Sequence, residues 1–142
     1  MWCKKMLLAY DGSPASKKAL QLALDEAKRD ESIGIVAAHV LKIAAHGSSA
    51  VQEALIANAE DIHRELEEAL SSVLNPSKVK ILKGTSPADL ILACAKEEEC
   101  NLIIMGSRGR GGAKGYLGSV SYAVVQRGSD AAVLIVKEGT RL

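Results

Sequence analysis

The 142-residue sequence contains no phenylalanine, and aromatic residues make up only 3% of it. Protein modules that bind RNA or single-stranded DNA stack the bases on aromatic side chains, so this chain has little from which to build such a surface. The net charge of +1 adds no overall attraction to a polyanion. These features predict a protein with no nucleic-acid partner.

Long apolar runs are missing as well. No run approaches the roughly 18 residues that a transmembrane helix needs. The N-terminal segment MWCKKMLLAYDGS has two lysines and a short apolar run. The turn-forming residues DGS follow this run too soon to leave room for the apolar region and cleavage site of a signal peptide. We therefore expect a cytoplasmic protein with no membrane partner.

Cysteine is scarce and unpaired. Cys3, Cys94 and Cys100 lack the CxxC spacing of a zinc or redox site. An odd number without a pairing pattern is typical of a reducing compartment. The three residues fit small buried apolar side chains better than redox-sensing thiols.

Familiar catalytic and phosphate-binding motifs are absent too. No GxSxG precedes a predicted helix. The histidines do not fit the pattern of a Ser-His-Asp catalytic triad, and they lack the spacing of metal ligands. The P-loop pattern fails because Gly111 is followed by Gly112 instead of lysine, and no GxGxxG follows the first predicted strand. His39 falls inside a predicted strand and fits a core position better than a catalytic one. The sequence therefore predicts no catalytic residue.

A regular alternation of apolar runs and amphipathic segments is what the sequence does have. The predicted strands cover residues 4–10, 33–42, 78–84, 100–106 and 131–138, and the predicted helices cover 13–30, 51–74, 86–99 and 119–128. Continuous apolar strands that alternate with helices predict an open parallel sheet, covered by helices on both faces and wound by right-handed crossovers. No linker or internal repeat interrupts the pattern, so residues 1–142 are expected to form one α/β domain.

The stretch GSRGRGGAKGYLGSVS, residues 106–121, lies between a predicted strand and a predicted helix. It has six glycines, two arginines, one lysine and no acidic residue. Glycines let backbone N–H groups approach an anion, and the start of a helix adds unpaired donors and a positive dipole end. The stretch thus predicts a phosphate cradle, to which Arg108, Arg110 and Lys114 would add charge. The alternative is a surface loop that binds nothing.

A second candidate loop is AYDGSP, after the first predicted strand. Ligands of open α/β sheets bind beyond the carboxyl ends of the strands, where the strand order reverses. Asp11 in this loop is either a turn former and helix cap or a carboxylate that holds ribose hydroxyls or a metal. The pattern leaves both readings open.

Together, the segments LLAYDGSPASKKAL, AAHV, GTSPADLILACAKEEECNLIIMGSRGRGG, GSVS and AAVLIVK resemble the universal stress protein family over nearly the whole chain. The resemblance implies a twisted five-stranded parallel sheet of order 3-2-1-4-5, Rossmann-like and similar to the adenine nucleotide alpha hydrolases, commonly in a dimer. One branch of the family binds ATP through G-x2-G-x9-G-[S/T], and the other lacks this motif. The present chain has Gly106-x2-Gly109-x8-Gly118-Ser119, one residue shorter than the motif.

The resemblance also implies an ATP site, residue by residue. The adenine and ribose would be met by Ala9, Tyr10, Asp11, Val40, Met105 and Gly106. The phosphates would be met, through backbone N–H groups and hydroxyls, by Gly109, Gly118, Ser119, Val120 and Ser121. Arg108 is added from its charge and is not a motif position.

The sequence is thus identified as that of an ATP-binding universal stress protein, a stress-response regulator or nucleotide-dependent switch with at most slow ATP hydrolysis. ATP would bring Mg²⁺ or Mn²⁺, with no metal ligand identified on the chain. A homodimer is expected through the last strand, residues 131–137, because an apolar edge strand without proline needs a partner. Two alternatives stay open: a dimeric interaction module of the same fold that binds no nucleotide, and an α/β enzyme that uses an adenylate intermediate.

Overall fold

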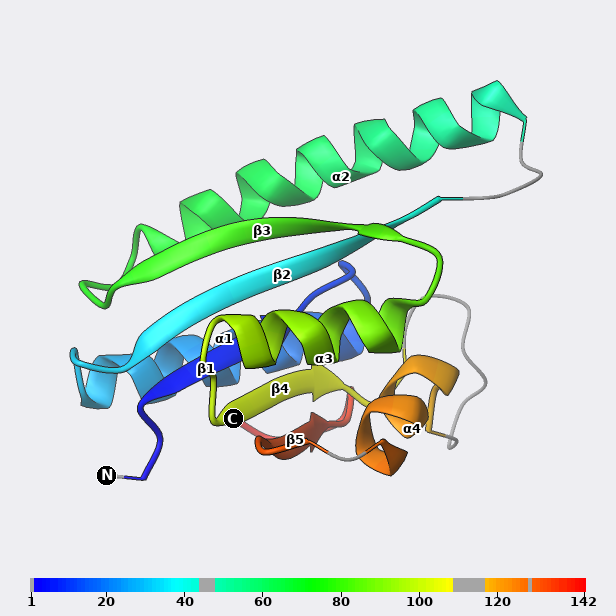
Figure 1. Ribbon diagram of the computed structural model, residues 1–142. Helices are drawn as coiled ribbons and strands as arrows, with labels where there is room; N and C mark the ends of the chain where they lie inside the picture. The colour runs from blue at the N-terminus through cyan, green and yellow to red at the C-terminus, as the bar shows by residue number, and fades with distance from the viewer. Residues whose placement is uncertain (1, 44–47, 109–116, 128) are drawn as a thin grey trace.

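The computed structural model describes residues 2–43, 48–108, 117–127 and 129–142. Strands and helices alternate along the chain (Figure 1). The elements are β1 (Lys5–Ala9), α1 (Pro14–Arg29), β2 (Gly34–Lys42), α2 (Ser49–Leu70), β3 (Ser77–Gly84), α3 (Pro87–Glu97), β4 (Leu102–Gly106), α4 (Ser119–Gln126) and β5 (Ala132–Val136). Every predicted element is present, with ends that differ by a few residues.

The five strands form one parallel sheet of order β3-β2-β1-β4-β5, which confirms the predicted fold. β1 lies in the centre, where Leu8 pairs with Ala37 of β2 and with Ile104 of β4. Its residues 6–9 are all buried, as their continuous apolar character requires in a sheet covered on both faces.

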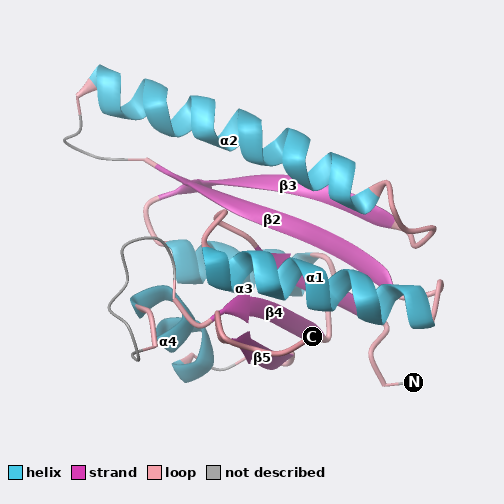
Figure 2. Ribbon diagram, turned by 180° about the vertical axis from the view of Figure 1, so that it is seen from behind, coloured by secondary structure: helices cyan, strands magenta, loops and turns pink. Residues whose placement is uncertain are grey.

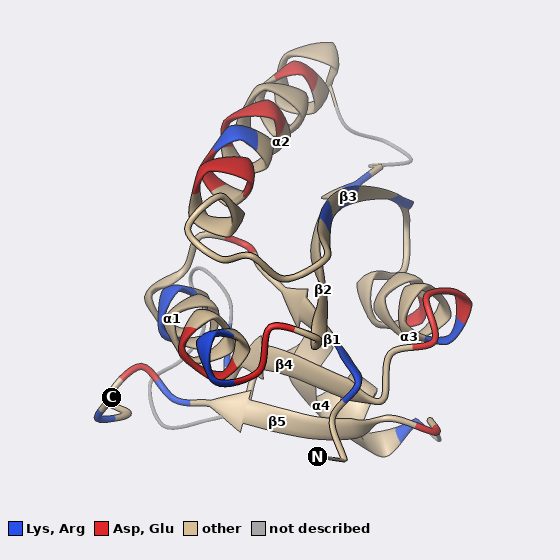
Figure 3. Cartoon of the chain, turned by 90° about the vertical axis from the view of Figure 1, so that its left-hand side faces the viewer, with Lys and Arg blue, Asp and Glu red and all other residues tan. Residues whose placement is uncertain are grey.

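Helices cover the two faces of the sheet. Figure 3 shows α1 and α2 on one face and α3 and α4 on the other. Successive residues of β1 point to opposite faces, so Leu8 joins the core beneath α1 and α2, whereas Leu7 joins the core beneath α3 and α4. α1 lies close to the sheet because the small residues Ala15, Ala19, Ala23 and Ala27 form its buried side.

The helix ends follow local side-chain chemistry. Ser13 caps α1, since its Oγ accepts a hydrogen bond from the Ser16 N–H, and Pro14 occupies the first helical position. α2 ends at Leu70, earlier than the predicted residue 74, because the hydroxyls of Ser71 and Ser72 donate to carbonyls of its last turn. Gly128, the last residue of the fourth predicted helix, lies outside the described residues.

Two asparagines tie the loops at the amino end of the sheet. The Asn75 side-chain amide donates to the carbonyl oxygens of Ala27, Asp30 and Ile33 at 2.9–3.1 Å, and so joins the loop after α1 to the loop after α2. Asn101 receives the Lys4 N–H at 3.0 Å. These side chains replace the backbone partners that irregular segments lack.

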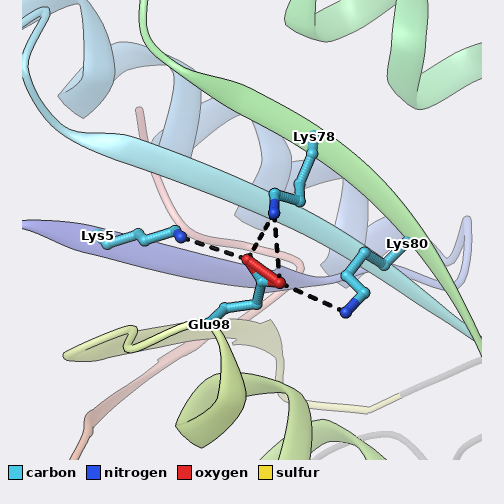
Figure 4. Close-up of polar contacts among 4 residues, drawn as sticks. All are labelled: Lys5, Lys78, Lys80 and Glu98. Carbon is cyan, nitrogen blue, oxygen red and sulfur yellow. Dashed lines mark hydrogen bonds and ion pairs between the residues drawn. The ribbon is translucent and has the colours of Figure 1, made fainter.

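A single carboxylate gathers three lysines at the same end of the sheet. Glu98, just after α3, is 3.3 Å from Lys5 of β1, 2.8 Å from Lys78 of β3 and 3.4 Å from Lys80 of β3 (Figure 4). The hydrogen bond from Lys78 is the main reason why the pKa of Glu98 falls to about 2, with Lys5 and Lys80 contributing in the same direction. The cluster joins the central strand, the edge strand and the end of α3.

None of the helices in the described parts of the chain combines the length and the apolar character needed to cross a membrane.

Candidate functional site

The strand order reverses between the central strand β1 and its neighbour β4. A cavity of about 590 Å³ lies at the carboxyl ends of these strands, bounded further by β2 and by residues of all four helices. This is the position at which open α/β sheets bind their ligands, and the size suits a small organic molecule.

The cavity brings together the predicted site residues that the structure describes. They come from the ends of three strands and the start of α4: Ala9, Tyr10, Asp11, Val40, Met105, Gly106, Arg108, Gly118, Ser119, Val120 and Ser121. Gly109, Arg110 and Lys114 lie outside the described residues.

The backbone of Tyr10 is fixed by the fold. Its N–H donates to the Ala38 carbonyl oxygen at 2.9 Å, and its own carbonyl oxygen lies 2.8 Å from Nδ1 of His39. A carbonyl oxygen can only accept, so His39 carries a proton on Nδ1 and acts as a structural donor, as its buried position in β2 indicates. The Tyr10 hydroxyl donates to Glu65 of α2. Tyr10 therefore contributes a rigid wall to the cavity.

Asp11 forms the turn that its sequence context suggests, and it also lines the cavity. Its Oδ1 accepts the Ser13 N–H at 2.9 Å and so shapes the turn before α1. Gly12 has φ 80°, a conformation that glycine adopts without strain. Within the described residues Oδ2 has no hydrogen-bond partner, and Asp11 is the single carboxylate among those that line the cavity. One oxygen serves the turn, and the other is available to a ligand.

Gly106 permits a close contact between β4 and α1. A Cβ atom at this position would lie 2.8 Å from both the Ala15 Cβ and the Ser16 backbone nitrogen. The glycine is therefore required by packing at the floor of the cavity, whatever its part in ligand binding.

The start of α4 is held against the end of β4. The Gly118 N–H donates to the Ser107 carbonyl oxygen at 2.6 Å. The buried Ser121 hydroxyl is 2.8 Å from the same oxygen and 3.0 Å from the Gly118 carbonyl oxygen. The Ser121 hydroxyl and the Gly118 N–H are thus engaged within the protein, so neither is the donor that a phosphate would meet.

The first turn of α4 provides the remaining donors. Gly118 is the N-cap, and the first backbone hydrogen bond runs from the Tyr122 N–H to the Gly118 carbonyl oxygen at 2.9 Å. The N–H groups of Ser119, Val120 and Ser121 therefore have no intrahelical acceptor. Together with the positive end of the helix dipole, they favour an anion at the cavity wall that these residues form.

Arg108 has a partner within the protein. Its Nη2 lies 2.8 Å from Oε2 of Glu138, beyond β5, and its side chain is only 18% exposed. Arg108 therefore ties the end of β4 to the segment that follows β5, and part of its charge is neutralised there.

Sequence reasoning missed several lining residues, among them Ser13, His39, Leu55, Asn58 and Ile91. The helical residues could not be found from local patterns, because these patterns do not reveal how α2 and α3 lie over the sheet. Within the described residues, no group of three or more His, Cys, Asp or Glu side chains could hold a metal ion.

The sheet and its cavity define an α/β protein of the Rossmann-like class, with its candidate ligand site where the strand order reverses. The profile of the Universal stress protein family matches residues 3–137. The chain is 33% identical over 136 residues to the "Universal stress protein in QAH/OAS sulfhydrylase 3'region" of Thermus aquaticus. It is 36% identical over 151 residues to the universal stress protein YxiE of Bacillus subtilis (strain 168). Each alignment covers 94% of this chain and 98% of the relative. The chain belongs to the universal stress protein family.

Solved structures share this fold. The universal stress protein UspA from Lactobacillus plantarum has a TM-score of 0.80 at 23% identity, over 94% of this chain and 97% of that one. A universal stress protein in complex with cAMP has a TM-score of 0.73 at 22% identity, covering 96% and 98% of the two chains. An Arabidopsis thaliana family member with AMP bound has a TM-score of 0.71 at 18% identity, covering 94% and 91%.

Proposed function

We propose that the protein binds ATP in the cavity at the carboxyl ends of β1 and β4 and acts as a nucleotide-dependent regulator. The observation that carries this proposal is the pairing of two features in one cavity. The start of α4 offers three N–H groups without an intrahelical acceptor, and one oxygen of the Asp11 carboxylate has no partner among the described residues. Two proteins of the same fold have an adenine nucleotide in their structures, as their names state.

Different residues of the cavity would bind the ribose, the adenine and the phosphates of the nucleotide. Oδ2 of Asp11 would accept hydrogen bonds from the ribose hydroxyls. The apolar side chain of Val40 would contact the adenine, and Met105 and Gly106 would flank the ribose. The N–H groups of Ser119–Ser121 would donate to phosphate oxygens. Gly109, the other phosphate-site candidate, lies outside the described residues.

A metal ion would enter with the nucleotide. Mg²⁺ prefers oxygen ligands and is commonly held through substrate phosphates, so the phosphates of the bound nucleotide would supply its ligands. We propose at most slow hydrolysis, because the buried His39 already holds the Tyr10 carbonyl and Asp11 supports the turn before α1.

A homodimer through the last strand, residues 131–137, completes the proposal. In the described sheet β5 pairs only with β4, so its outer edge is open to a second copy. Three free cysteines agree with a reducing cytoplasm, which we propose as the location of the protein.

Ser119→Pro tests the phosphate contacts directly. Proline is tolerated at the first helical position, where Pro14 and Pro87 already stand in α1 and α3. It also requires an extended residue before it, and Gly118 has ψ 157°. The variant removes one N–H donor and should lower ATP affinity about ten- to hundredfold, since a hydrogen bond to a charged group contributes roughly 1.5–3 kcal/mol. Adenosine affinity should stay unchanged.

Matched variants separate the contributions in calorimetric titrations. Ser119→Ala removes only the hydroxyl, and Ser49→Pro places a proline at the same position of α2, where ATP binding should not change. Asp11→Asn keeps an oxygen for the Ser13 N–H and should weaken ATP and adenosine alike.

The same titrations distinguish the alternatives. A folded wild type that binds no ATP would indicate an interaction module without nucleotide. Pyrophosphate release that depends on a second substrate would indicate an enzyme with an adenylate intermediate. Equal ATP affinity of the wild type, Ser119→Pro and Asp11→Asn would contradict the proposed site.

A further inference from the structure

α2 is packed against the sheet along only half of its length. The second half carries the buried residues Ala59, Ile62, Leu66 and Leu70. None of the residues from 49 to 58 is buried. In Figures 1 and 2 the helix diverges from β3 toward its own N-terminus. Along the first half of α2, the described residues therefore leave apolar surface uncovered on the helix and on the strands beneath it.

A groove of about 940 Å³ lies in this space, which we call the α2–β3 groove. Its apolar walls come from Leu41 and Ile43 at the end of β2, Ile81 of β3 and Ile56 of α2. Ile43 and Ile56 remain 45% and 42% exposed, so large aliphatic side chains face solvent from both walls. A concave recess of this size with apolar walls is typical of a small-molecule site.

The groove is elongated. The residues of α2 that line it include Ser49, Gln52, Ile56 and His63, which recur at helical spacing along one side of the helix. At 1.5 Å per residue, Ser49 and His63 are about 21 Å apart along the axis. An elongated recess between a helix and an edge strand admits a chain-like molecule better than the convex surface of a folded protein.

The charges of the groove favour an anion at one end. Arg64 pairs with Asp61, and His63 lies 3.6 Å from Glu67. Lys83 lines the groove at the carboxyl end of β3, and within the described residues no carboxylate pairs with it. Lys83 is therefore the positive charge in the groove that is available to pair with an anionic ligand.

The remaining groove charge, Glu60, defines the orientation. α2 begins at the end of the sheet where β3 ends (Figure 1). Glu60 lies eleven residues beyond Ser49, about 16 Å further along the helix axis. An anionic head group would therefore lie beside Lys83 and the start of α2, and its apolar tail would run along the aliphatic walls.

We infer that the α2–β3 groove binds a single-chain amphiphile with an anionic head group, of the fatty-acid class. The groove is separate from the proposed ATP site, because Leu41 is the one described residue that lines both cavities. The carboxylate would pair with Lys83, and the acyl chain would cover Ile43, Ile56 and Ile81. This inference does not depend on ATP binding.

Titration of the full-length protein with dodecanoate, below the concentration at which it forms micelles, tests the inference. We expect saturable binding that is tighter than that of octanoate, since burial of each further methylene is favourable. Dodecanol and dodecylammonium should bind more weakly than dodecanoate. Saturating ATP should leave dodecanoate binding unchanged, and this comparison separates the groove from the proposed nucleotide site.

Variants locate the ligand. Lys83→Gln should weaken dodecanoate binding about two- to fivefold, the range for a partly exposed ion pair, and should leave dodecanol binding unchanged. Ile56→Ser should weaken both ligands at least about fivefold because the tail loses an aliphatic contact. The controls are Lys17→Gln on the exposed side of α1 and Val51→Ser, an exposed apolar residue of α2 that does not line the groove.

Several results would overturn the inference. They are a dissociation constant above about 1 mM for dodecanoate, equal binding of dodecylammonium, competition with ATP, or unchanged binding by Ile56→Ser. Light scattering on the same samples provides a further check. If Ile56→Ser lowers the molecular mass and the wild type binds no dodecanoate, the groove is covered by a second copy of the chain.

Discussion

The Gly118 N–H donates a 2.6 Å hydrogen bond to the carbonyl oxygen of Ser107, so the chain that leaves β4 returns to the same point before α4 begins. A Cβ atom on Gly118 would lie 2.9 Å from the Arg108 Cα, which shows how closely the two ends approach. This contact fixes the start of α4 independently of the number of residues between the ends. The spacing of eight residues where the family motif has nine is therefore compatible with an unchanged helix start.

Gly106→Ala should destabilise the protein. The added methyl would meet the Ser16 backbone nitrogen at 2.8 Å, and backbone atoms of a packed helix cannot move aside easily. We expect a loss of about 1–3 kcal/mol in the free energy of unfolding, as for other overpacked sites, measured by urea denaturation. Gly139→Ala is the matched control, since no atom lies within 4 Å of the added methyl. Equal stability of the two variants would show that β4 and α1 are not held as closely as described.

The Glu98 cluster should make stability depend on pH in the acid range. Hydrogen bonds, chiefly from Lys78, lower the pKa of Glu98 from 4.5 to about 2. Between these pH values the unfolded chain binds more protons, so the stabilisation is present above pH 4.5 and is lost as the pH falls toward 2. In the Glu98→Gln variant, the free energy of unfolding should depend less on pH within this range than in the wild type.

Glu97→Gln provides the control for this prediction. Glu97 is exposed, lies next to Glu98 and forms no ion pair with a described residue. Between pH 2 and 4.5, the free energy of unfolding of Glu97→Gln should change with pH as steeply as that of the wild type. An equal slope for wild type and Glu98→Gln would show that the lysines do not hold the carboxylate in solution.

The cysteines should react slowly in the folded protein. All three thiols are free and buried. Burial raises the pKa of Cys100 to about 11 and also raises the pKa values of Cys3 and Cys94, so little reactive thiolate exists near neutral pH. Ellman's reagent at pH 8 should label fewer than one thiol per chain quickly and all three after denaturation in guanidinium. Rapid labelling of a native thiol would restore the redox-sensor interpretation.

Leu134→Asp tests the proposed dimer. Val133 and Ile135 of β5 pack against the core beneath α3 and α4, whereas Leu134 is 40% exposed, so its replacement should spare the fold. Light scattering should show a dimer for the wild type and a monomer for Leu134→Asp. Leu74→Asp, at an 83% exposed position after α2, should remain dimeric. A monomeric wild type at micromolar concentration would exclude the dimer.

The sheet order and the position of the cavity could be predicted because they follow from the alternation of elements and from resemblance along the chain. Side-chain partners could not. Neither the engagement of the Ser121 hydroxyl with Ser107 nor the pairing of Arg108 with Glu138 has a local signal, since the partners are 14 and 30 positions apart. The contribution of Leu55 to the cavity depends on how α2 lies over β2, which is set by packing across the sheet.

Because of Asn75, the loops at the amino and carboxyl ends of the sheet should differ in how well they tolerate insertions. At the amino end the Asn75 amide donates to the carbonyl oxygens of Ala27 in the last turn of α1 and of Asp30 and Ile33 in the loop that follows. An insertion in either neighbouring loop would therefore displace several hydrogen bonds together. At the carboxyl end of the sheet, the described loop residues border the cavity. Insertions should therefore be tolerated less well beside Asn75 than at the carboxyl end of the sheet, because only the former would break these hydrogen bonds.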